Sequence, residues 1–164
     1  MNDLSFIKLN GKRGGFAVVD SEDFERLNAR KWRINRRGYV AHTINNSRRF
    51  TIILLHREVL NLPRSQGYED MVDHRNGIKT DNRRTNIRPC NRIQNSANRP
   101  APANNTSGFK GVVLDKRSGK WYAQIRFNQL HIHIGSFRTK QIAALAYDQK
   151  ARELFGDFAN FNFK

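Results

Sequence analysis

The segment from Val72 to Asn95 contains the side chains with which this chain could do chemistry. Asp73 stands beside His74, Asn86 follows twelve residues after His74, and Asn95 comes nine residues later. Asp73 and the amide oxygen of Asn95 are oxygen ligands of the kind that Mg²⁺ and Mn²⁺ prefer. His74 can remove a proton from water because its proton affinity lies nearest neutral pH. The segment therefore predicts one divalent cation held over a phosphodiester, beside an activated water.

The same spacing resembles the HNH endonuclease motif, in which a two-stranded ribbon and a helix clasp one metal ion. On that resemblance His74 is the general base, and Asn86 braces the loop and orients the imidazole. Asp73 and Asn95 are then the ligands of a single Mg²⁺ or Mn²⁺ ion. The last position of the motif is Asn here, a variant found among phage-type homing endonucleases. The alternative is an ordinary basic surface turn, which the complete quartet and the NRRTNIR segment disfavour.

Local patterns indicate the elements that would position these residues. Asn76-Gly77 is a strong turn signal after the acid-imidazole pair. Residues 86–88 are typical of a short return strand, which Pro89 would end. Residues 91–98 would form a helix, and Asn95 on that helix would point back toward the ribbon.

The chain is expected to fold in the α+β class, as several small modules. Its 164 residues suggest one domain by length, but residues 99–108, RPAPANNTSG, have no periodicity and are typical of a linker. Apolar patterns resume on both sides of it. We therefore expect four parts: an N-terminal β-rich scaffold module (1–60), a ββα-metal HNH core (61–99), a linker (100–107) and a DNA-binding domain (108–164).

The first sixty residues show short strand signals around one acidic helix start at residues 20–23. Strands are expected at 16–19, 31–34, 38–43 and 50–54, followed by a short helix, LHREVL. His56 in that helix could be catalytic. We favour a scaffold role, because on the resemblance a His-Arg pair recurs just before the HNH ribbon.

Residues 107–164 predict a three-stranded antiparallel sheet packed on one helix. Alternating segments cover 109–114, 120–127 and 130–134, with turns at Ser118-Gly119 and Asn128-Gln129. One face of the sheet would be apolar and the other would offer hydrogen-bond donors. The helix would begin at Thr139, and Gly156 would stop it.

This module resembles the ethylene-response-factor (Apetala-type) DNA-binding domain of plant transcription factors. The matching elements are FKGV, GKWYAQIR, IGSF, the Ala-rich AYD helix and the closing NF. The family lays its sheet in the major groove, which implies duplex DNA as partner and most of the target selection. The candidate DNA contacts of the module are Lys110, Lys116, Lys120, Gln124, Arg126, His131 and His133.

Three positions depart from the plant pattern. Val113 replaces an Arg of the family, and His131 and His133 replace a groove-facing Arg and Trp. The base preference should therefore differ from that of the plant domains. The alternative for the two histidines is that they are merely solvated strand residues.

Charge points to a polyanionic partner along the whole chain. The net charge is +16, and it divides into +10 for residues 1–106 (twenty Lys/Arg, ten Asp/Glu) and +6 for residues 107–164 (ten against four). Within the motif, five cations are expected to grip phosphates: Arg75, Lys79, Arg83, Arg84 and Arg88.

Membranes and disulfides are not expected to contribute. The longest apolar run, residues 52–55, is far too short to span a bilayer, and no signal peptide is visible. The single Cys90 excludes an intramolecular disulfide and a Cys-rich zinc site. We expect a cytoplasmic monomer, in a bacterial or phage-infected cell, without an obligate protein partner.

Together these features predict a site-specific, metal-dependent HNH homing endonuclease that leaves 5′-phosphate and 3′-hydroxyl ends. The main alternative is a non-catalytic DNA-binding regulator that keeps an HNH scaffold. RNA cleavage is less favoured, because a sheet docks more readily in the groove of B-form DNA than in that of A-form RNA.

Overall fold

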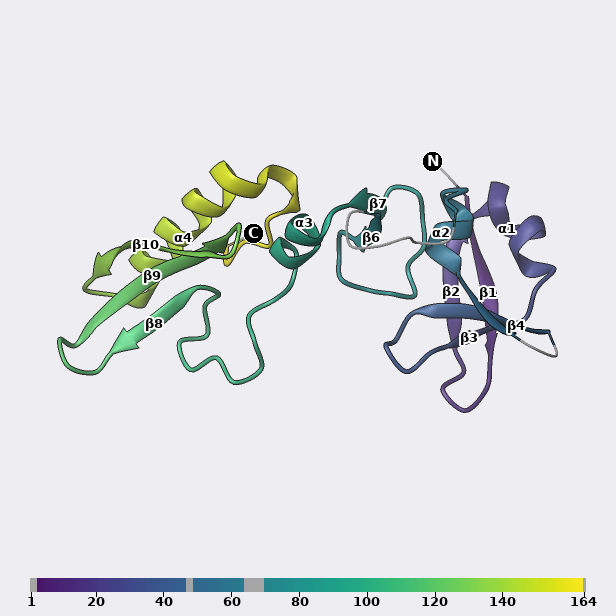
Figure 1. Cartoon of the computed structure of the whole chain (residues 1–164), viewed down its shortest axis with the longest axis horizontal. Coiled ribbons are helices and arrows are strands. Elements are labelled where there is room, and N and C mark those ends of the chain that lie inside the picture. Colours follow the sequence, from purple (N-terminus) through teal and green to yellow (C-terminus); the bar gives the residue numbers. More distant parts are fainter. Residues whose placement is uncertain (1–2, 47–48, 64–69, 164) are drawn as a thin grey trace. The chain divides into compact units, whose positions relative to one another are not determined.

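The computed structural model describes residues 3–46, 49–63 and 70–163. The fold is α+β, as expected, and divides into two compact units, Met1–Asn91 and Arg92–Lys164 (Figure 1). Each unit has its own hydrophobic core. Within the described ranges, no helix is long and apolar enough to cross a membrane.

The first unit is built on a five-stranded sheet in the order β2-β1-β3-β4-β5. β1 is parallel to β3 and antiparallel to β2, so the turns that follow β1 and β3 leave the sheet at the same end (Figure 1). β1 was not expected from the sequence. The strands are β1 (Leu4–Asn10), β2 (Phe16–Asp20), β3 (Trp32–Ile34), β4 (Val40–Asn46) and β5 (Arg49–Leu54).

Two short helices and a two-stranded ribbon complete the core of this unit. Trp32 is fully buried, and its indole N–H donates to Leu27 O at 2.7 Å, at the end of α1 (Ser21–Asn28). α2 (Leu55–Val59) follows β5 directly. Val72 and Ile87 of the ribbon belong to the same buried cluster as Trp32, so the ribbon is built onto the N-terminal sheet.

The ribbon pairs β6 (Met71–His74) with β7 (Ile87–Cys90), in the register Asp73↔Arg88 and His74↔Ile87. The expectation that Pro89 ends the return strand was wrong, because Pro89 lies opposite Val72 and the strand continues to Cys90. Both strands of a two-stranded ribbon have an open edge, where the missing N–H of proline breaks no ladder bond.

The second unit contains the expected three-stranded antiparallel sheet, in the order β10-β9-β8, with α4 packed on it. The expected helix limits are confirmed: Thr139 accepts the Ile142 N–H, and Gly156 caps the end with a positive φ of 52°. β10 runs past the expected Ile134 to Phe137, and its register with β9 shifts at a bulge between His133 and Gly135. The elements are β8 (Val112–Asp115), β9 (Lys120–Phe127), β10 (Leu130–Phe137), α4 (Lys140–Phe155) and η1 (Gly156–Phe158).

The helix that carries Asn95, α3 (Arg92–Ala97), packs within the second unit. Ala97 is buried, and its carbonyl accepts from Asn160 N at 3.1 Å and from Lys110 Nζ at 2.5 Å. Ser107, inside the segment expected to be a linker, is also buried and hydrogen-bonds Phe109 O. The division at Asn91–Arg92 thus falls inside the range 61–99 expected for the nuclease core.

Candidate active site

His74 is the last residue of β6, and a tight turn follows it. Gly77 N donates to His74 O at 2.8 Å, and Gly77 has a φ of 74°, which glycine adopts without strain. Asn76-Gly77 therefore forms the turn that the sequence predicted. The His74 side chain is only 4% exposed, because the turn folds the following loop back over it.

Asn86 braces that loop from its far end. Its Nδ2 donates to Asp81 O at 2.7 Å, and its Oδ1 accepts the Asn76 N–H at 3.1 Å. Its carbonyl accepts the Arg75 N–H at 2.8 Å, which closes the base of the loop. These contacts hold both ends of the loop between β6 and β7 together. None of them is to the imidazole.

The amide that faces the imidazole is Asn82, which is fully buried. Its Oδ1 lies 3.4 Å from His74 Nε2, and its Nδ2 donates to Lys79 O at the same distance. A backbone carbonyl only accepts, so the amide nitrogen must face Lys79 and the oxygen must face the ring. The ring nitrogen facing Asn82 is therefore the protonated one, which leaves Nδ1 as the proton acceptor of neutral His74.

Sequence reasoning missed Asn82, although it lies in the loop that was singled out. Its backbone N–H donates to Val18 O at 2.8 Å, which straps the loop to β2. An asparagine in a polar loop carries no periodic signal that distinguishes a buried side chain from a solvated one. The pairing of the loop with Val18, from a distant strand, is what buries it.

Two aromatic rings pack near the imidazole of His74. The His56 ring centroid lies 5.2 Å from that of His74 in an edge-on contact, and the Tyr39 centroid lies 5.4 Å from His56 and 6.0 Å from His74. Burial, followed by the charges of His74 and Arg57, lowers the pKa of His56 to about 3. His56 is thus neutral at pH 7, as suits the scaffold role favoured from the sequence.

The pKa of His74 is also lowered, chiefly by burial. The hydrogen bond to Asn82 and the charge of Asp73 act in the opposite direction and raise it. The balance leaves His74 unprotonated at neutral pH. A neutral imidazole with a fixed ring orientation can accept a proton from water.

Asp73, beside His74, is 5% exposed and is held by Arg88. Its Oδ2 accepts from Arg88 Nε at 3.0 Å and from Nη2 at 2.8 Å, and Arg88 is itself buried. Arg88, expected to grip phosphate, is therefore committed to a carboxylate. Asn95, the other expected metal ligand, is half-buried on α3 of the second unit.

The donor set around Asp73 suits only certain ions. Among the described residues, no group of three or more His, Cys, Asp or Glu side chains could hold a metal ion. An ion at Asp73 would therefore need amide and water oxygens besides the carboxylate. Mg²⁺ and Mn²⁺ accept such oxygen sets, whereas Zn²⁺ favours nitrogen and sulfur ligands.

The other cations expected to grip phosphate are held differently. Arg83 forms a two-point ion pair with Asp81, at 2.8 and 2.6 Å, and Arg84 forms one with Asp23, at 2.9 Å for both contacts. Arg75 is exposed. Lys79 Nζ donates to a backbone carbonyl, Arg37 O, at 2.7 Å.

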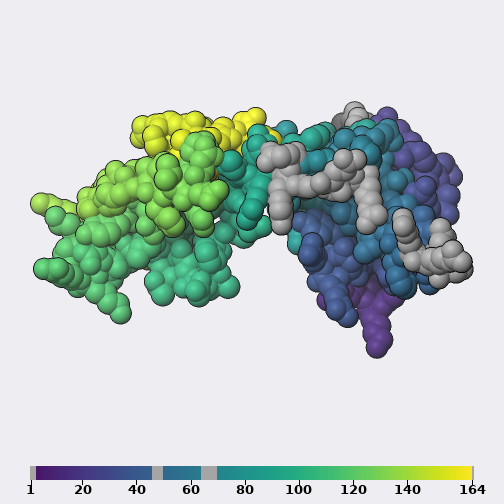
Figure 2. Space-filling model, viewed as in Figure 1, coloured from purple at the N-terminus to yellow at the C-terminus, as the bar shows by residue number. Residues whose placement is uncertain are grey.

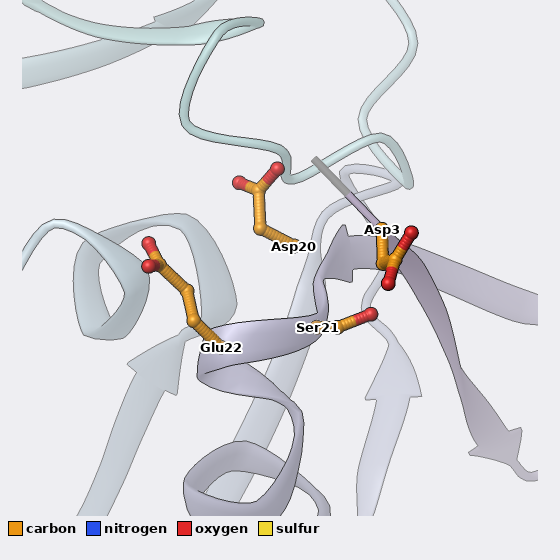
Figure 3. Close-up of a pocket in the computed structure, with 4 residues that line it drawn as sticks. All are labelled: Asp3, Asp20, Ser21 and Glu22. Atoms are coloured by element: carbon orange, nitrogen blue, oxygen red, sulfur yellow. The ribbon is translucent and has the colours of Figure 1, made fainter. Parts of the chain in front are cut away.

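A small acidic pocket at the start of α1 helps to anchor the same loop. It is lined by Asp3, Asp20, Ser21 and Glu22 (Figure 3). Asp20 Oδ2 accepts the Arg84 backbone N–H at 2.8 Å, so this carboxylate ties the loop to the first helix. The pocket is thus explained by its structural contacts.

The second unit brings most of its candidate DNA contacts onto one face of the sheet. His131 lies opposite Arg126 and His133 opposite Gln124, so these four side chains share that face. All four are exposed, as are Lys120 and Lys116. Lys110 is the exception, because its Nζ is turned inward to Ala97 O, and burial lowers its pKa to about 8.

Comparison with known proteins finds one viral relative over most of the chain and plant relatives over part of it. The chain is 29% identical to an uncharacterized HNH endonuclease of Acanthamoeba polyphaga mimivirus over 161 residues, which cover 94% of this chain and 78% of the viral protein. No protein-family model matches the chain, and no solved structure matches it.

Plant proteins match a shorter stretch, 37–41% of this chain. Dehydration-responsive element-binding protein 2E of Oryza sativa subsp. japonica is 41% identical over 63 residues, which are 37% of this chain and 20% of the plant protein. APETALA2-like protein 2 of Oryza sativa subsp. indica is 34% identical over 65 residues, which are 40% of this chain and 15% of that protein. The chain therefore spans no more than about a fifth of these two plant relatives.

Proposed function

We propose that this chain is a site-specific, divalent-metal-dependent HNH DNA endonuclease of the homing type. It would hydrolyse phosphodiester bonds to 5′-phosphate and 3′-hydroxyl ends. The observation that carries the proposal is a buried, neutral His74 of fixed orientation, next to the carboxylate of Asp73. The viral relative named as an HNH endonuclease, which matches nearly the whole chain, supports it.

In this proposal His74 Nδ1 takes a proton from the water that attacks phosphorus. Asn82 Oδ1 accepts the hydrogen on Nε2 and so keeps the opposite nitrogen unprotonated. The rings of His56 and Tyr39 restrict rotation of the imidazole. Asn86 acts one step further away, by keeping the loop that carries Asn82 closed.

Asp73 and Asn95 are the proposed ligands of one Mg²⁺ or Mn²⁺ ion. When bound, such an ion supplies positive charge for the pentacovalent phosphorus and the leaving 3′ oxygen. We assign Arg88 to orienting the Asp73 carboxylate, because both side chains are buried in one ion pair. A carboxylate fixed in this way loses little freedom when it binds a cation.

The sheet of the second unit is the proposed site of target selection on duplex DNA. Its exposed face combines Arg126 and Gln124 with two histidines, and a plant protein that matches part of this chain is named a dehydration-responsive element-binding protein. Arg and Gln side chains can read guanine and adenine edges in the major groove. The same match favours the second candidate, a DNA-binding regulator without catalysis.

A cleavage assay distinguishes the two candidates. The full chain is incubated with a randomised duplex library in Mg²⁺, in Mn²⁺ and in EDTA, and the new ends are sequenced and tested for 5′-phosphate. We expect selective cuts with either metal and none in EDTA. Tight, selective binding with no cut under any of these conditions would instead establish the regulator.

A further inference from the structure

Six arginines of the first unit are neutralised by a carboxylate, whereas a separate group of lysines and arginines is not. Each of these six guanidinium groups pairs with an Asp or Glu at 2.6 to 2.9 Å. These cations have limited capacity for an outside anion, since a carboxylate already occupies their donors. The group consists of Arg26, Arg30, Arg57, Arg83, Arg84 and Arg88.

A second group gathers where two turns leave the sheet at the same end. Because β1 and β3 are parallel, the turn after β1 and the turn after β3 are neighbours. No ion pair joins these cations to a carboxylate within the described part of the chain. We call the group the basic turn cluster, and its members are Lys12, Arg13, Arg36, Arg37 and Lys79.

Hydrogen bonds hold this cluster together. Arg13 Nη1 donates to Asn35 O at 2.9 Å, which joins the first turn to the second. Lys79 Nζ donates to Arg37 O at 2.7 Å, which joins the second turn to the loop between β6 and β7. Figure 2 shows the purple turn after β1 projecting from the surface, with blue residues of the second turn beside it.

The chain segments that contain the two turns have no acidic residue. No Asp or Glu occurs between Glu25 and Glu58, a stretch with nine Lys/Arg, and none occurs between Asp3 and Asp20. Of the four acidic residues that bracket these stretches, Glu58 pairs with Arg30 and Asp20 accepts the Arg84 backbone N–H. The surface potential at the turns is therefore strongly positive.

One member of the cluster, Lys79, lies near the candidate catalytic base, His74. Lys79 Nζ lies 4.3 Å from the centre of the Tyr39 ring, and that ring lies 6.0 Å from the ring of His74. A polyanion lying along the two turns would thus reach the His74 site without leaving the first unit.

We propose that the basic turn cluster is a DNA-binding surface of the nuclease unit, which holds the backbone phosphates of duplex DNA next to His74. The inference rests on the proposed function for the identity of the polyanion. On this proposal the phosphates are bound by cations of the cluster, which are not ion-paired, and not by the ion-paired Arg83, Arg84 and Arg88. Phosphate contacts carry no base information, so this surface positions the cleaved strand and leaves target selection to the second unit.

The test compares two double variants of the full chain that remove equal charge. Arg36→Ala/Arg37→Ala removes two exposed members of the cluster, and Arg26→Ala/Arg30→Ala removes two ion-paired arginines of the same unit. Binding to a labelled duplex is measured in EDTA over a range of NaCl concentrations, with circular dichroism as a check of folding. For the cluster variant we expect weaker binding and a salt slope smaller in magnitude by about 2, whereas the matched variant keeps the wild-type slope.

Three results would overturn the proposal. An unchanged slope for Arg36→Ala/Arg37→Ala would show that these cations do not meet phosphate. An equal loss of DNA affinity in the two variants would show that binding depends on the net charge of the chain and not on this cluster. A duplex RNA of the same sequence that bound more tightly, and alone showed the slope change, would assign the surface to RNA. The readout is binding without metal, so failure of the wild type to cleave would defeat the proposed function and leave this result standing.

Discussion

The two units use their polar side chains in opposite ways. In the first, Asp73, His74, Asn82 and Asn86 are buried, and Arg88 is buried with them as the partner of Asp73. In the second, the polar side chains of the sheet project into solvent, and the core beneath is built largely of alanines on β9 and α4.

The difference follows from what each unit would have to do. A buried carboxylate or imidazole costs desolvation free energy, which is recovered only if its partners are fixed, so burial comes with defined geometry. An exposed side chain has no such constraint and stays available for a ligand. The first unit therefore resembles a pre-organised reaction centre, and the second a rigid platform for a solvated reading surface.

Small residues make that platform possible. Ala143 and Ala144 of α4 are fully buried against the sheet, which brings helix and strands close together. Gly111, in the FKGV segment, has a φ of 74°, and a Cβ there would collide with the Tyr147 ring and with the Gln124 carbonyl. The glycine of that segment is thus required both by its backbone conformation and by close packing.

Removing the proposed base from the first unit should produce the largest effect. His74→Ala should lower the cleavage rate by roughly 10²–10⁴-fold, the usual contribution of a general base, and leave DNA affinity within a few-fold of wild type. Single-turnover cleavage and anisotropy binding are the measurements. His42→Ala, which removes a histidine of the same unit that packs edge-on against Trp32, is the control. Undiminished cleavage by His74→Ala would refute the assignment.

The burial of His56 should make the first unit sensitive to acid. Its pKa is about 3 in the folded chain and about 6.5 when unfolded, so between these values the unfolded state binds the extra proton. Stability is therefore lost as pH falls from 6.5 toward 3, by about 1.4 kcal/mol for each pH unit.

His56→Phe keeps an aromatic ring and removes this proton site. Urea unfolding is measured at about pH 7, 5.5 and 4.5, which cover that window. The free energy of unfolding should fall less steeply with decreasing pH for the variant than for wild type. Identical pH dependence in the two proteins would mean that His56 does not carry the acid sensitivity.

Replacing Asn82 should have a smaller effect, because it acts through His74. Asn82→Leu should lower the cleavage rate by roughly 10–100-fold, the usual cost of losing a residue that orients a functional imidazole. The ¹⁵N chemical shifts of the His74 ring should also change, from one dominant tautomer to a mixture. Loss of activity with the tautomer unchanged would indicate a role for Asn82 in loop structure alone.

Much of the fold of the second unit could be predicted from the sequence, because local signals determine it. The alternation from Lys120 to Phe127 gave the strand limits, and Thr139 and Gly156 gave the helix limits. Ser118-Gly119 and Asn128-Gln129 lie at the turns, and Gly119, Asn128 and Gln129 all have positive φ. Each of these features depends on a few neighbouring residues.

The first unit was harder because its key contacts join distant segments. The parallel pairing of β1 with β3, and the strap from Val18 to Asn82, leave no periodic trace in the sequence. The ion pair between Arg88 and Asp73 could not be predicted from residue types alone, because it depends on the register of the ribbon. The residue types of the candidate site were thus readable from the sequence, but their partners were not.

The most localised effect we predict is confined to one or two base positions; it lies on the exposed face of the second unit and tests whether this face reads bases. Arg126 lies opposite His131, in the row of side chains expected to enter the major groove, where arginine favours guanine. Arg126→Ala should cost roughly 1–3 kcal/mol for the preferred base at one or two positions and less elsewhere. Lys120→Ala, at the start of the same strand, should instead weaken binding to all sequences alike. The measurement is binding of both variants to a set of single-base variants of the selected target. If Arg126→Ala also gave uniformly weaker binding, Arg126 would hold phosphate, and both units would then contact DNA through its backbone.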